Sequence, residues 1–100
     1  MWEVKIHPLV LTEDLKGLDL RLRRKIFHAI QEKLTTDPEN YGKPLVGEFK
    51  GYYRLHVEDY RIIYRIVKKE IQVLVLKIGI RRDDEVYREL FKRLRKLGLI

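Results

Sequence analysis

The sequence contains no cysteine, which excludes disulfide bonds, thiolate nucleophiles and cysteine-rich zinc sites. It also lacks any run of about 18 apolar residues, so no membrane-spanning helix is expected. The first residues include an early acidic side chain and no long apolar stretch, so we expect no secretory leader. Internal repeats and low-complexity segments are absent as well. These absences predict a cytoplasmic globular protein.

Basic residues are in excess, and they are unevenly distributed. The 100 residues are enough for one domain, 1–100, with its own core, and they carry a net charge of +7. Residues 1–49 contain as many acidic as basic side chains, whereas residues 50–100 contain fourteen basic and seven acidic ones. This asymmetry indicates a polyanionic partner, either nucleic acid or an acidic protein. A merely solvated basic surface is the alternative.

The first 43 residues read as a strand, two helices and a loop. Apolar residues alternate over residues 2–7, which predicts a half-buried strand. Residues 9–16 are a short helical candidate that Gly17 ends, and Asp19 is a suitable cap for a second helix to about Leu34. Helices this close in sequence predict an antiparallel hairpin. Residues 35–43 contain Pro38, Asn40 and Gly42, and are expected to form a loop.

From residue 52 the apolar period changes to two. Residues 52–57, 60–67 and 71–78 predict three strands joined by tight turns, the last buried on both faces. Asp83 or Asp84 caps a final helix whose apolar stripe is Val86, Leu90, Leu94 and Leu97. The expected fold class is α+β, in the order β-α-α-β-β-β-α: an antiparallel sheet of about four strands with an N-terminal helical hairpin and a C-terminal helix.

Alternation also predicts a cluster of cations. Arg54 and His56 share one face of their strand, and a hairpin at residues 58–59 brings Arg61 and Arg65 to that face. Because opposed like charges are unfavourable, we expect the face to be open, with exposed arginines, and suited to anions. Arg81 and Arg82 follow the last strand, and Tyr87 lies one turn into the final helix. The alternative is that Arg54, Arg61 and Arg65 are strand-surface charges paired with Glu58, Glu70 or Glu85.

These side chains suit RNA cleavage by the 2′-hydroxyl group. Arginine clamps phosphate and neutralises the charge that grows at phosphorus, while histidine moves a proton near neutral pH. The basic half has no second histidine, and no carboxylate is evident in the cluster, so a two-residue acid–base scheme is not supported. No Walker loop, Ser-His-Asp set or metal-ligand spacing is present. The basic run at residues 92–96 reads as the solvated side of the final helix.

Residues 51–66, GYYRLHVEDYRIIYRI, and residues 77–87, KIGIRRDDEVY, resemble the RelE/ParE toxin superfamily of toxin–antitoxin systems. The resemblance extends from about Val4 to Leu94 and includes Leu45–Gly47. It implies the small RelE-like fold. RelE-like members are basic ribonucleases that enter the ribosomal A site, cut mRNA without a metal and leave a cyclic phosphate.

Carried over by position, the resemblance assigns catalytic roles to Arg54, His56, Arg61, Arg81 and Tyr87. We add a set of basic residues as candidate RNA contacts: Arg21, Arg24, Lys50, Arg65 and Arg82. RelE has lysines where Arg54 and His56 stand, and many relatives have histidine in place of Ile80. Since arginine is a poor base, His56 takes that role or the chemistry relies on orientation and charge.

The implied partners are a cognate antitoxin, the ribosome and mRNA, with no metal, cofactor or membrane. Two alternatives stay open. ParE-like members share the fold but poison DNA gyrase, and they generally lack the full set of basic residues and the tyrosine. A toxin-fold protein without catalytic activity would only bind an antitoxin or RNA.

Overall fold

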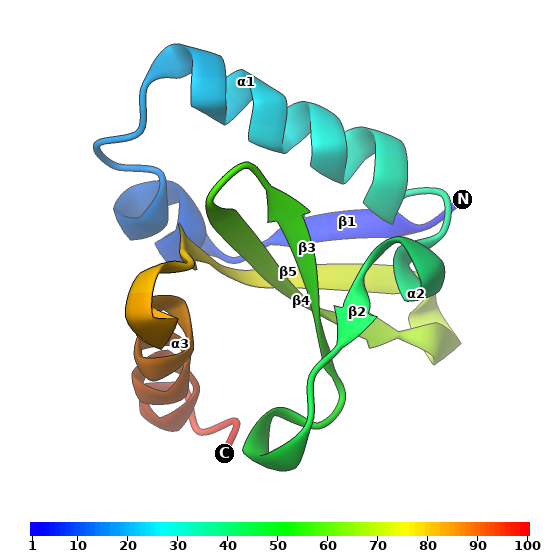
Figure 1. The fold of residues 1–100 in the computed structure, drawn as a ribbon. Helices are drawn as coiled ribbons and strands as arrows, with labels where there is room; N and C mark the ends of the chain where they lie inside the picture. Colours follow the sequence, from blue (N-terminus) through cyan, green and yellow to red (C-terminus); the bar gives the residue numbers. More distant parts are fainter.

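A five-stranded mixed sheet runs through the middle of the molecule (Figure 1), in a computed structural model that describes residues 1–100 apart from the side chain of Asp83. The strands are β1 (Glu3–Ile6), β2 (Lys43–Pro44), β3 (Tyr52–Val57), β4 (Tyr60–Val67) and β5 (Gln72–Ile80). They lie in the order β1-β5-β4-β3-β2. β1 is parallel to β5, and all the other pairs are antiparallel.

The four predicted strands are confirmed, but the predicted antiparallel sheet of about four strands is wrong in two respects. The N-terminal strand pairs in parallel with β5, and the two-residue strand β2 adds a fifth member. Alternation reports which residues share a face and not the direction of the neighbouring strand, and two residues are too few to show a period. Neither feature was therefore readable from the sequence.

Three helices and five short helical turns complete the fold. They are η1 (Val10–Asp14), α1 (Leu20–Ala29), η2 (Ile30–Leu34), α2 (Pro38–Tyr41), η3 (Gly47–Phe49), η4 (Lys68–Glu70), η5 (Arg82–Asp84) and α3 (Glu85–Lys96). The expected N-terminal pair is unequal, because η1 is a single turn packed against β5. α2 occupies the segment predicted as a loop, with a proline at its start. No helix in the described structure is long and apolar enough to cross a membrane.

The helix boundaries follow the capping signals in part. The Asp19 carboxylate accepts a hydrogen bond from the Leu22 N–H at 2.8 Å, which confirms the predicted cap of α1. Asp84 stands at the start of α3 with a left-handed φ of 58°, but its side chain makes no capping hydrogen bond. The side chain of Asp83, the other predicted cap, lies outside the described part of the chain.

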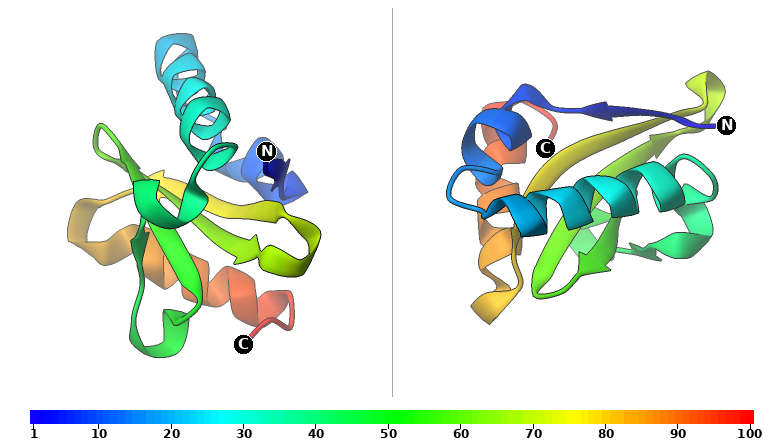
Figure 2. Two further views of the ribbon diagram at one scale, coloured as in Figure 1. Left: turned by 90° about the vertical axis from the view of Figure 1, so that its right-hand side faces the viewer. Right: turned by 90° about the horizontal axis from the view of Figure 1, so that it is seen from above.

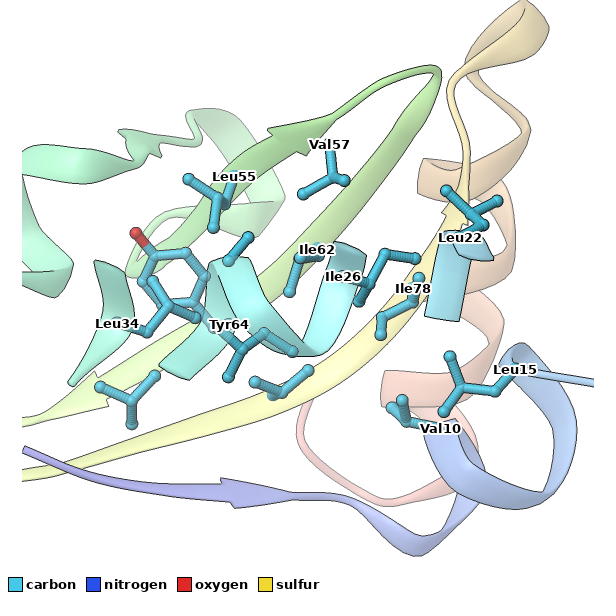
Figure 3. Packing of buried hydrophobic residues seen from close by; sticks show 14 residues of the cluster. Val10, Leu15, Leu22, Ile26, Leu34, Leu55, Val57, Ile62, Tyr64 and Ile78 are labelled. Carbon is cyan, nitrogen blue, oxygen red and sulfur yellow. The ribbon is translucent and has the colours of Figure 1, made fainter. Parts of the chain in front are cut away.

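The sheet is covered by α1 on one face and by α3 on the other, as the left panel of Figure 2 shows. The α1 side of the sheet buries Leu22, Ile26, Ile30 and Leu34, which recur at every fourth position. They belong to one apolar core with strand residues that include Leu55, Val57, Ile62, Tyr64 and Ile78 (Figure 3). Burial of such side chains is the main stabilising term in folding.

The α3 face has a smaller core. Val86, Leu90 and Leu94 are fully buried against strand residues such as Ile63 and Leu76, as predicted, whereas Leu97 is only half-buried. Arg93 belongs to the basic run that was predicted to be solvated, but it is buried. The prediction is wrong because residues 86, 90, 93 and 94 lie on one side of a 3.6-residue helix, so Arg93 faces the sheet.

Tyr64 links the α1-side core to the segment before β2. Its ring stacks on that of Tyr53, its antiparallel partner, with ring centroids 5.6 Å apart. Its buried hydroxyl donates a 2.6 Å hydrogen bond to the carbonyl oxygen of Pro38. A buried hydroxyl and a buried carbonyl thus satisfy each other.

Replacing Tyr64 with phenylalanine should lower the free energy of unfolding by about 1–2 kcal/mol, because the Pro38 carbonyl loses its buried donor while the ring packing stays. Urea denaturation followed by circular dichroism would measure this. Tyr41→Phe, at an exposed tyrosine of α2, is the matched control and should leave the midpoint unchanged. Equal midpoints for Tyr64→Phe and wild type would contradict the assigned role of the hydroxyl.

Candidate anion-binding site

Strand register gathers basic side chains on the α3 face of the sheet. His56 on β3 lies opposite Arg61 on β4, and Arg54 on β3 lies opposite Lys43 on β2. Directly opposed residues of antiparallel strands project to the same face. Residues 54 and 56 are two apart on one strand, so all four side chains share a face. With Arg81, which follows β5, we refer to these residues as the cationic cluster.

Arg61 is buried within this cluster, with only 6% of its surface exposed. The prediction of an open face with an exposed Arg61 is therefore wrong. β4 is a central strand, so Arg61 is flanked by β3 and by Gly79 of β5, and the first turn of α3 packs on Gly79 through Val86. Arg54 is half-buried, and His56, on the outer strand of this pair, is exposed.

Among the described side chains, the arginines of the cluster have no counter-ion. The Nε atoms of Arg54 and Arg61 are buried and have no hydrogen-bond partner among the described residues. None of the ion pairs recorded for the described side chains includes Arg54, Arg61 or Arg81. Burying a charge without a partner is costly. An external anion would supply the missing partner.

The alternative pairing of these arginines with surface carboxylates is not observed. Glu58, in the β3–β4 turn, instead bonds to Arg21 at 2.8 Å and to Lys25 at 2.9 Å on α1. These hydrogen bonds hold the pKa of the Glu58 carboxyl down at about 2. Glu58 therefore links the β3–β4 turn to α1 and does not neutralise the cationic cluster.

The electrostatic field of the cluster acts on His56. Desolvation lowers the pKa of its imidazole below the usual 6.5, and so do neighbouring charges, in decreasing order those of Arg61, Arg54, Lys43 and Arg81. The imidazole is therefore neutral at pH 7 and has a nitrogen lone pair available to accept a proton. Arg81 is held beside the β3–β4 turn, because its backbone N–H donates to the Asp59 carbonyl oxygen at 2.8 Å.

Tyr87, the remaining predicted catalytic residue, is half-buried near the start of α3 and packs against Phe49, with ring centroids 6.3 Å apart. Phe49 comes from η3, just before β3. The two rings line a groove of about 350 Å³, whose other walls are Glu48, Asp84, Arg88, Phe91 and Lys92. The recorded ring contact of Tyr87 is thus with Phe49 and not with the cationic cluster.

The five predicted RNA contacts are exposed but do not gather at the cluster. Arg21 pairs with Glu58 and Arg24 lies on α1, on the opposite face of the sheet. Arg65 shares the face of Arg61, yet it lies four residues further along β4, about 13 Å away. Lys50 follows η3, and Arg82 begins η5.

Sequence reasoning missed Lys43. The residue was included in a predicted loop, and only the pairing of β2 with β3 places it opposite Arg54. The Lys-Pro pair offers no periodic signal, so nothing short of the tertiary pairing identifies it. The described residues contain no group of three or more His, Asp or Glu side chains arranged to hold a metal ion.

Comparison with known proteins gives a family and a fold. The family model described as "ParE toxin of type II toxin-antitoxin system, parDE" matches residues 4–85. A chain of the RelBE2 toxin–antitoxin complex from Mycobacterium tuberculosis is 27% identical, with a TM-score of 0.74, and the match covers 82% of this chain and 93% of that one. Comparison with curated protein sequences gives no significant match.

Two further structures extend this likeness. A chain of the archaeal RelE–RelB complex from Pyrococcus horikoshii OT3 is 28% identical, with a TM-score of 0.59, over 82% of this chain and 97% of that one. A doubly substituted E. coli toxin RelE in the free state is 20% identical, with a TM-score of 0.71, over 93% of this chain and 97% of that one. The second likeness concerns the fold alone.

Replacing Arg61 with methionine should stabilise the protein and abolish its response to anions. The variant keeps a long apolar stem but removes a buried charge without a partner, so the free energy of unfolding should rise by about 1 kcal/mol or more. Low-millimolar sulfate should stabilise wild type by mass action and have little effect on the variant. Urea denaturation at fixed ionic strength measures both effects.

Lys69→Met, which removes one exposed charge from η4, is the control and should keep the wild-type response to sulfate. An Arg61→Met protein that is less stable than wild type and still gains stability from sulfate would show that Arg61 serves packing and not anion binding.

His56 should make the protein less stable in mild acid. Its folded-state pKa lies below the unfolded value of 6.5, so the unfolded state binds more protons as the pH falls. Stability is unaffected well above pH 6.5 and decreases as the pH falls through 6.5 toward the lower folded-state pKa. His56→Gln should reduce this decrease, whereas His28→Gln on the exposed face of α1 should not. Urea unfolding midpoints measured across this pH range test the prediction. An equal change of the midpoint with pH in wild type and His56→Gln would contradict it.

Proposed function

The chain belongs to the ParE toxin family of type II toxin–antitoxin systems, within the RelE/ParE superfamily, and we propose that it acts as a ribosome-dependent endoribonuclease on mRNA. The observation that carries this proposal is the cationic cluster. A buried Arg61, which has no counter-ion among the side chains that the structure describes, lies opposite a histidine that is neutral at pH 7. A phosphodiester next to a 2′-hydroxyl group matches both features.

The proposed reaction is an internal transfer at phosphorus. The 2′-oxygen forms a bond to the neighbouring phosphorus, the bond from phosphorus to the 5′-oxygen breaks, and a 2′,3′-cyclic phosphate and a 5′-hydroxyl group result. His56 accepts the proton of the 2′-hydroxyl. Arg61 and Arg54 neutralise the charge that develops on the phosphoryl oxygens, which is the largest contribution expected of such a site. Water supplies the proton to the leaving 5′-oxygen.

The remaining residues have supporting roles in this proposal. Arg81 extends the positive charge from the end of β5, and Lys43 adds a second cation beside Arg54. Tyr87 and Phe49 offer aromatic faces on which an unpaired RNA base can stack. The mRNA and the ribosome are the proposed polyanionic partners. An acidic antitoxin is the proposed protein partner, since the RelBE2 and RelE–RelB relatives are complexes of that kind.

Inhibition of DNA gyrase is the second candidate, because the matching family model is that of ParE toxins. The nuclease is favoured by the presence of Arg61, Arg81 and Tyr87, which ParE-like members generally lack as a set. A supercoiling assay separates the two candidates.

Primer extension on an mRNA carried by translating ribosomes tests the proposal, with the same mRNA free in solution as a parallel sample. We expect cuts within A-site codons on ribosomes and none in free mRNA. Arg61→Met should reduce the cleavage rate at least about 100-fold, because it removes a charge that stabilises the transition state. Lys69→Met should cut like wild type.

Cuts in both samples would reject the dependence on the ribosome while keeping the ribonuclease. No cuts in either sample, together with inhibition of supercoiling by purified protein, would replace the proposal with the gyrase candidate. Full cleavage by Arg61→Met would remove the cationic cluster from the mechanism.

A further inference from the structure

The carboxylate of Asp14 is buried where η1, β5 and α3 meet, with 1% of its side chain exposed. It accepts four hydrogen bonds. Arg93 donates two of them, at 2.7 and 2.9 Å, one to each carboxylate oxygen. The Lys77 ammonium donates at 3.0 Å and the backbone N–H of Ile78 donates at 2.8 Å. The Asp14 side chain therefore joins its own element, η1, to β5 and α3, which are far from it in the sequence.

The two buried cations also reach carboxylates nearer the surface. Lys77 lies 3.1 Å from Glu89 on α3, and Arg93 lies 3.6 Å from Glu13 on η1. Both cations are less than 10% exposed, whereas Glu13 and Glu89 are about half-exposed. The two buried cations are therefore neutralised within the fold, in contrast to the arginines of the cationic cluster.

Asp14 and Arg93 bond to backbone groups that the sheet leaves without partners. β1 pairs with β5 only as far as Val75, so the Ile78 N–H lies beyond the last pair and is taken by Asp14. A β-bulge between β4 and β5 leaves Leu76 without a pairing residue, and its carbonyl accepts a 3.1 Å hydrogen bond from Arg93. The network therefore holds α3 against the irregular part of β5.

The chain between these anchor points carries site residues. It leaves the network at Ile78, passes Arg81, enters α3 before Tyr87, and returns to the network at Arg93. The fit at the start of α3 is close: a Cβ atom on Gly79 would lie 2.9 Å from the Val86 side chain. A shift of α3 relative to β5 would therefore move both Arg81 and Tyr87.

We propose that Asp14 is a positioning residue for the site. A buried ion pair adds little net stability compared with apolar packing, but an arginine bonded to both oxygens of a carboxylate fixes direction as well as distance. Asp14 thereby fixes the position of α3 relative to β5, and this position determines where Arg81 and Tyr87 lie. The kinetic part of this inference rests on the proposed ribonuclease function, and the structural part does not.

A neutral replacement of the network tests the proposal. The triple variant Asp14→Asn, Lys77→Met, Arg93→Gln removes the three buried charges and leaves the half-exposed Glu13 and Glu89 in place. The two amides keep an acceptor for the Ile78 N–H and a donor for the Leu76 carbonyl. Cleavage on ribosomes should show kcat reduced about tenfold or more, with KM changed less than about threefold, because misplacement by an ångström is enough for such a loss. Nuclear magnetic resonance signals of the Tyr87 ring and of the Arg81 and Arg82 amides should shift.

Tyr64→Phe is the matched control, since it removes a buried hydrogen bond on the opposite side of the sheet. Tyr64→Phe should lower stability but leave both kcat and the Tyr87, Arg81 and Arg82 resonances unchanged. A triple variant that keeps the wild-type kcat and the wild-type resonances would overturn the proposal and leave the network a purely structural feature.

If the triple variant fails to fold, Arg93→Lys replaces it, because lysine keeps the charge but loses the paired contact with both oxygens. The same reduction of kcat and the same shifts are expected, and their absence would overturn the proposal. If wild type does not cut mRNA at all, the proposed function fails, while the Tyr87 and Arg81 resonances still decide whether Asp14 positions them.

Discussion

The arrangement of the second face of the sheet depends on how α3 is held there. On the first face, α1 packs over a continuous apolar core, and its recorded ion pairs to the sheet are exposed ones with Glu58. On the second face, α3 contributes three fully buried apolar side chains together with Arg93, which bonds to the buried carboxylate of Asp14. The two faces thus have different physical characters. Apolar burial on the first face stabilises the fold, whereas the paired contact of Arg93 with Asp14 on the second face fixes the orientation of α3.

The part of the second face that α3 does not anchor carries the cationic cluster. The second face as a whole has two buried arginines, Arg61 on β4 and Arg93 on α3, which differ in their partners. Arg93 is neutralised by a carboxylate within the fold, whereas Arg61 has no counter-ion among the described residues. A buried charge of the first kind is structural, and one of the second kind reduces stability unless a ligand neutralises it. This difference is why we assign function to Arg61.

Local patterns in the sequence predicted a large part of this structure. Two-residue periodicity located β3 and β4 and placed Arg54, His56 and Arg61 on one face, because side chains of a strand alternate strictly. The Asp19 cap and the stripe of α3 were also readable, since capping and helical periodicity depend on neighbours a few residues apart. These features need no knowledge of what packs against them.

Contacts between distant segments decided the rest. The parallel pairing of β1, the short strand β2 with Lys43, the burial of Arg61 and the bonding of Asp14 to Arg93 all join residues that local periodicity cannot relate. The sequence by itself determined which residues form strands and helices and which of them share a face, because those properties arise from local geometry. Only the tertiary structure decided which cations are neutralised and which remain without a partner, because charge compensation depends on what the completed fold brings into contact.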